Sequence, residues 1–172
     1  MKDIKRRICT ILILALLFTV IQPSVSHAQS NGGIQGDGWR ISEDYVLTIS
    51  KFVVEKDGEG ILNNEWEEYR QHITEIRISG AEIVEEDKES NDSEQASKRK
   101  GRNWRGLFKK MRKLEKVTIN KLDLSKVSDV SDMFYDDYEL KNVSINWSLG
   151  EQTKDISGMF AWCDKLDRKS VV

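Results

Sequence analysis

Residue types that carry out covalent chemistry are scarce in this chain. Beyond residue 28 it contains one histidine, His72, and one cysteine, Cys163. Nucleophilic catalysis needs a nucleophile, a base and an orienting group, and a zinc site needs several Cys or His ligands at defined spacing. The acidic residues between positions 129 and 137 lack the alternating ligands and turn glycine of a calcium loop. We therefore expect no catalytic residues, no metal site and no cofactor, and we do not expect an enzyme.

A run of basic residues between positions 98 and 113 is the sharper candidate for a site. One interpretation is an electrostatic patch for heparin-like polysaccharide, anionic cell-wall polymer or membrane. The other is a solvated loop whose charges pair with the acidic run just before it. In the first interpretation the polyanion-binding residues are Lys98, Arg99, Lys100, Arg102 and Arg105.

A repeat of 26 residues organises the last third of the chain. Phenylalanine recurs at this interval, with leucine six residues later and isoleucine or valine eleven residues later. Matched apolar positions at a fixed period indicate a stacked-repeat protein, in which neighbouring units supply each other's core. The expected repeat core is Phe108, Leu114, Ile119, Phe134, Leu140, Ile145, Phe160 and Leu166. Trp147 and Trp162 lie off these positions, so they are either exposed aromatic contacts or packed within the turns.

The segments before the repeat predict a lead-in of mixed structure. Residues 39–41 and 46–49 flank a short polar turn and predict a β-hairpin. Residues 63–72 predict a helix, because Trp66, Tyr69 and Ile73 fall at helical spacing behind a capping asparagine. A second short helical segment is expected over residues 104–113, before a strand at residues 115–119. From Glu85 onward the intervening segment lacks apolar residues, so we expect residues 81–103 to be an exposed charged insertion.

The first 28 residues have the layout of a secretory signal peptide. A basic start precedes an apolar run, Pro23 follows it, and Ser26 and Ala28 provide the small residues of a cleavage site. The leader carries four of the 27 basic and one of the 29 acidic residues, so the exported chain has a net charge of −5. We expect an extracellular protein, secreted or at the cell surface, with no membrane span after cleavage, no C-terminal anchor and no nucleic-acid partner.

Two motifs extend the repeat into a family resemblance. Residues 129–134 read D-V-S-D-M-F and residues 155–166 read D-I-S-G-M-F-A-W-C-D-K-L. They resemble the D-(V/M)-S-x-M-F-x-x-C-x-x-L repeat of the BspA-like leucine-rich-repeat surface proteins of bacteria, although Asp137 replaces one cysteine. Residues 114–124 also have leucine-rich-repeat spacing. The resemblance implies a bacterial surface protein with a parallel-strand solenoid and an adhesion role, and it brings no catalytic residues.

Together these patterns predict an α/β fold. The expected architecture is a short leucine-rich-repeat-like solenoid of parallel strands with short helices or 3-10 turns. A flexible start at residues 29–38 would precede the hairpin, helix and first repeat strand of residues 39–80. The array would cover residues 104–172, with its last unit truncated. The expected function is that of an adhesion-type module that binds an extracellular protein or glycan. The alternative is a truncated N-terminal remnant of a longer surface protein with no independent activity.

Overall fold

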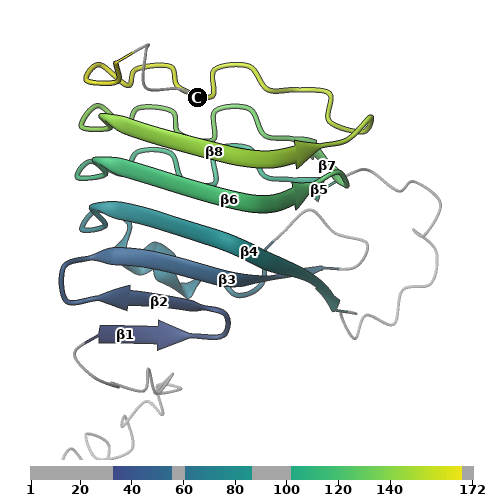
Figure 1. Cartoon of the computed structure of the whole chain (residues 1–172), viewed down its shortest axis with the longest axis horizontal. Coiled ribbons are helices and arrows are strands. Elements are labelled where there is room, and N and C mark those ends of the chain that lie inside the picture. Colours follow the sequence, from purple (N-terminus) through teal and green to yellow (C-terminus); the bar gives the residue numbers. More distant parts are fainter. Residues whose placement is uncertain (1–32, 56–60, 87–101, 168–172) are drawn as a thin grey trace, which may run out of the picture.

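The computed structural model describes residues 33–55, 61–86 and 102–167 (Figure 1). The expected signal peptide and three of the basic residues, Lys98, Arg99 and Lys100, lie outside these ranges, as do the last five residues. The backbone of Arg102 is described, and its side chain is not. No helix in the described part of the chain is long and apolar enough to span a membrane.

One mixed sheet of six strands dominates the molecule (Figure 1). Its first three strands form an antiparallel meander, and the third strand then continues into a parallel array with the remaining three. The order across the sheet is β1 (Gly33–Gly36), β2 (Trp39–Ser42), β3 (Val46–Glu55), β4 (Glu75–Glu86), β6 (Lys116–Leu124) and β8 (Asn142–Leu149). The predicted hairpin is present as β2 and β3, with Trp39 opposite Ile49.

The register of the parallel strands follows the repeat of the sequence. Val117 lies opposite Val143 and Ile119 opposite Ile145, so equivalent repeat positions pair across β6 and β8. Side chains alternate between the two faces of a strand, and one face carries the apolar residues that form the core. Its buried side chains are Leu47, Ile49, Ile76, Ile78, Val117, Ile119 and Val143.

A layer of turns covers the apolar face of the sheet (Figure 1). It contains the 3-10 helix η1 (Glu65–Tyr69) and a small parallel pair, β5 (Arg102–Asn103) with β7 (Val127–Asp129). Phe108 stacks on Phe134 with ring centroids 5.6 Å apart, and Phe134 stacks on Phe160 at 5.4 Å. Trp66 of η1 continues this stack, with its ring 5.4 Å from that of Phe108. The aromatic stack therefore joins successive turns behind the sheet.

The prediction of an α/β leucine-rich-repeat solenoid is wrong. The described protein is mostly β-structure on a mixed sheet, and η1, with five residues, is the only helical segment in the described ranges. The helix expected over residues 63–72 shrinks to η1, and the one expected over residues 104–113 is a series of turns.

Hydrogen bonds between successive turns explain the second of these differences. The N–H groups of Trp104, Gly106 and Phe108 donate to carbonyl oxygens 25 residues further along the chain, at Asp129, Ser131 and Met133. A helix would need the same N–H groups for carbonyl oxygens four residues earlier. Positive φ angles at Gly106 (64°) and Lys110 (60°) also exclude a continuous helix.

The predicted charged insertion is shorter than residues 81–103. Strand β4 continues to Glu86, and β5 begins at Arg102. The extension of β4 forms because Ile83 and Val84 lie opposite Phe52 and Val53 of β3. Half-buried Ile83 packs against the core. The acidic residues around it make this segment polar on average, so the sequence alone does not indicate the strand.

Candidate binding surface

The outer face of the parallel strands carries ranks of polar side chains. Thr48, Arg77, Thr118 and Ser144 lie side by side on β3, β4, β6 and β8, because each is the register partner of the next. A second rank two residues further along consists of Ser79, Asn120 and Asn146. We call these seven residues the strand face. All are exposed except Thr118, which is half-buried.

Charge on this side of the sheet is balanced locally. Both carboxylate oxygens of Glu75 accept hydrogen bonds from Arg77, at 2.9 and 2.8 Å. Lys116 on the neighbouring strand lies 3.0 Å from the same carboxylate. The hydrogen bonds from Arg77, with that from Lys116, hold the pKa of Glu75 below its ordinary value against the opposing effect of burial. The rest of the strand face is neutral, so it offers hydroxyl and amide groups to a partner.

The repeated Asp-x-Ser motif builds turns. Oδ1 of Asp129 accepts from the N–H of Ser131 at 2.8 Å, and Oδ1 of Asp155 accepts from the N–H of Ser157 at 2.8 Å. Asn103 makes the same bond to Arg105, also at 2.8 Å. These side chains therefore close the start of each turn by local hydrogen bonding. Within the described ranges no group of three or more His, Cys, Asp or Glu residues could hold a metal ion.

A second repeated position is occupied by Met111, Asp137 and Cys163. The N–H of Met111 donates to Oδ1 of Asp137 at 2.7 Å, and the thiol of Cys163 donates to the carbonyl oxygen of Phe134 at 3.1 Å. Burial raises the pKa of the Asp137 carboxyl to about 8 and that of the Cys163 thiol to about 11. Cys163 is free and buried, so its environment is that of a packing residue.

The expected repeat-core residues divide by position along the stack. Phe108, Leu114, Ile119, Phe134 and Leu140 are buried. The last three, Ile145, Phe160 and Leu166, are half-buried and pack against the core from one side.

The two candidate aromatic contacts have different environments. Trp147 is half-buried and packs against the core from strand β8. It lies opposite Leu122 in the register of β6 and β8 because a bulge after Asn120 shifts the pairing. Trp162 is 66% exposed at a turn with φ of 64°. It lies on the turn layer and not on the strand face.

The remaining candidates do not converge. Arg105 is exposed and pairs with Asp132 at 2.7 Å, so its charge is already neutralised. His72 is exposed and its ring stacks on that of Tyr45 at 5.5 Å. Sequence reasoning did not identify the residues of the strand face. The signal for them is a polar–isoleucine–polar triplet that recurs as R-I-S, T-I-N and S-I-N at residues 77–79, 118–120 and 144–146.

Comparison with known proteins adds no assignment. No protein-family model matches the chain, and neither does any curated protein or any solved structure.

Proposed function

We propose that the chain is a binding module, secreted or displayed at a bacterial cell surface, whose strand face holds an extracellular protein or glycan. The observation that carries the proposal is the alignment of hydroxyl and amide side chains across four neighbouring strands. Such a surface presents many equivalent hydrogen-bonding groups to one extended partner, as the extended faces of repeat proteins do.

Rigidity of the strand face supports this role. Its residues alternate along β4 and β6 with the fully buried core residues Ile78 and Ile119, and along β8 with half-buried Ile145. The backbone positions that carry these side chains are therefore fixed before a partner arrives. A surface that is ordered in advance loses less entropy on binding, which favours affinity.

The composition of the strand face supports a polar partner. Large apolar side chains are absent from its seven residues, and its one charged member, Arg77, is paired with Glu75. Hydroxyl and amide groups both donate and accept hydrogen bonds. A glycan or a polar protein surface meets these requirements, and the leader-like start of the sequence supports an extracellular partner.

Solid-phase binding tests the proposal. Purified chain is applied to immobilised extracellular-matrix proteins and to a glycan array, together with the variants Ser144→Arg and Gln152→Arg. Both positions are exposed, but only Ser144 belongs to the strand face, so the second variant controls for added charge. We expect saturable binding that Ser144→Arg abolishes and Gln152→Arg retains. Absence of binding to every surface, or equal loss in both variants, would refute the proposal.

A further inference from the structure

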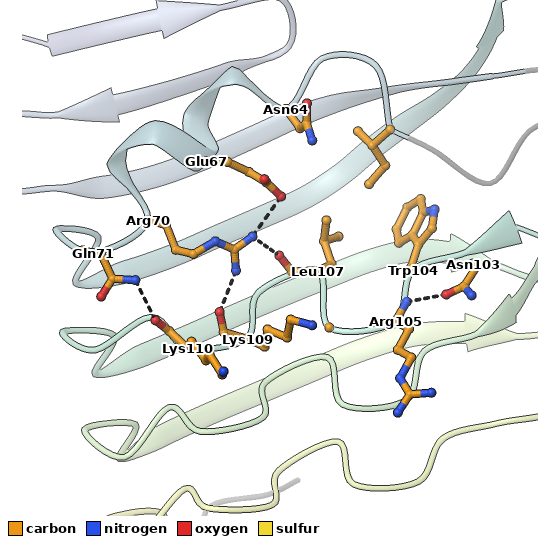
Figure 2. A pocket seen from close by; sticks show the side chains of 12 residues that line it. Asn64, Glu67, Arg70, Gln71, Asn103, Trp104, Arg105, Leu107, Lys109 and Lys110 are labelled. Atoms are coloured by element: carbon orange, nitrogen blue, oxygen red, sulfur yellow. Dashed lines mark hydrogen bonds and ion pairs between the residues drawn. The ribbon is translucent and has the colours of Figure 1, made fainter.

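A cleft of about 500 Å³ opens in the turn layer (Figure 2). The turn layer covers the face of the sheet opposite the strand face (Figure 1). Its walls are η1 with the residues around it and the segment 103–110. Side chains of Ile61 and Leu107 supply apolar surface, and basic and amide side chains surround them. This volume is within the range of small-ligand sites, roughly 300–1,000 Å³.

The N–H groups along one wall of the cleft are all engaged. Each N–H from residue 104 to residue 110 donates to a protein oxygen. Arg70 donates to the carbonyl oxygens of Leu107 and Lys109, at 2.9 and 2.6 Å, and Gln71 donates to that of Lys110 at 3.0 Å (Figure 2). A ligand in the cleft therefore meets side chains on a fixed frame, and the main chain of this wall offers it no free N–H.

The charges of the cleft are unequally neutralised. Arg70 pairs with Glu67 at 2.9 Å, and Arg105 pairs with Asp132 outside the cleft lining. The ammonium groups of Lys109 and Lys110 form no ion pair with any described residue. Asn64 lines the same cleft, and its side chain does not cap η1 (Figure 2). Two cations and one amide side chain therefore line the same cleft without an ion-pair or hydrogen-bond partner among the described residues (Figure 2).

We propose that this cleft binds an acidic saccharide through its carboxylate or sulfate group. Lys109 and Lys110 bind the anion, and the amide of Asn64 exchanges hydrogen bonds with a neighbouring hydroxyl. Ile61 and Leu107 contact the C–H face of the sugar ring. An acidic peptide fits less well, because extended peptides gain affinity from main-chain hydrogen bonds, and the N–H groups of residues 104–110 already donate to protein oxygens.

The proposal differs from the polyanion patch expected from the sequence. Within the basic run of residues 98–113, that patch consisted of Lys98, Arg99, Lys100, Arg102 and Arg105, whereas the cleft depends on Lys109 and Lys110 of the same run. The cleft shares no residue with the strand face, so loss of binding at one surface does not imply loss at the other.

The test is calorimetric titration of the purified chain with three probes. A heparin-derived hexasaccharide supplies sulfates, and a polygalacturonate-derived hexasaccharide supplies carboxylates. A hexaglutamate peptide carries as many side-chain carboxylates as the galacturonate hexamer, but on a peptide backbone. The variants are Lys109→Gln and Lys110→Gln. Arg112→Gln and Lys113→Gln are the matched controls, because they are exposed, lie in the same basic run and do not line the cleft.

We expect at least one acidic hexasaccharide to bind, and each cleft variant to weaken binding roughly tenfold or more, as expected for loss of a charged hydrogen bond. The control variants and the strand-face variant Ser144→Arg should bind as the unmodified chain does. Equal weakening by cleft and control variants would show diffuse attraction to the basic run and overturn the proposal. Failure of both saccharides to bind, or tighter binding of hexaglutamate, would also overturn it.

Discussion

The substitution Asp137→Asn tests how the fold tolerates an acidic residue inside the stack. The Asp137 side chain is 0% exposed. Its Oδ1 accepts from the N–H of Met111, while Oδ2 is buried and has no hydrogen-bond partner among the described residues. Burial is the largest influence on this carboxyl and raises its pKa from 3.8 to about 8. At neutral pH the folded protein therefore holds Asp137 in its protonated form.

The direction of the pH dependence follows from this raised pKa. The unfolded chain releases the proton near pH 4, and the folded chain retains it until about pH 8. The contribution of Asp137 to the free energy of unfolding is therefore fully present below pH 4 and is lost as the pH rises toward 8. The loss amounts to about 1.4 kcal/mol per pH unit, or on the order of 5 kcal/mol across the window.

Urea unfolding at pH 4.5, 6, 7 and 8 measures this effect. Asparagine keeps an oxygen for the Met111 N–H and does not ionise, so Asp137→Asn should gain stability relative to the unmodified chain by about 1.4 kcal/mol per pH unit. The substitution Glu151→Gln removes an acidic group from an exposed position that does not influence Asp137, and it serves as the control. A constant free-energy difference between Asp137→Asn and the unmodified chain from pH 4.5 to 8 would refute the reasoning.

Two further predictions concern the stack and its cysteine. Phe134→Ala should lower the free energy of unfolding by about 3–5 kcal/mol, because Phe134 is fully buried between two other rings. Phe160→Ala should lower it by less, because Phe160 is half-buried. Equal losses for the two variants in urea unfolding would contradict this order. Cys163 should react slowly with a thiol-specific chromogenic reagent at pH 8 and rapidly in denaturant, because burial holds its thiol pKa at about 11; rapid reaction of the folded chain would show that the thiol is accessible.

Periodicity in the sequence predicted that successive units stack, and it marks the positions that pair. The interval between Phe108 and Phe134 equals the interval between Val117 and Val143, which are register partners on neighbouring strands. Alternating apolar residues likewise predicted the hairpin of β2 and β3. These features depend on local pattern and on a fixed period, both of which a single sequence displays.

The two helix predictions were wrong because the hydrogen bonds that determine these backbone conformations are not local. Helical spacing of Trp66, Tyr69 and Ile73 is also compatible with a 3-10 helix followed by turns, and the choice depends on bonds between successive turns. The sequence of residues 104–113 gives no sign that its N–H groups donate to the following turn. Tertiary hydrogen bonding overrode intrinsic helix preference there.

The two candidate surfaces were hidden for different reasons. The strand face consists of common residue types, and only the register of four strands brings Thr48, Arg77, Thr118 and Ser144 together. In the turn layer, Arg70 binds carbonyl oxygens 37 and 39 residues away, which closes one wall of the cleft. Neither long-range arrangement follows from composition or spacing.

Residue-resolved NMR titration tests the central claim most directly. Backbone amide shifts of the purified chain are recorded as the glycan or matrix protein selected by solid-phase binding is added. The strand-face proposal predicts that the largest saturable shifts fall at Thr118, Asn120, Ser144 and Asn146. Shifts confined to the turn layer, with those four amides unchanged at saturation, would contradict it.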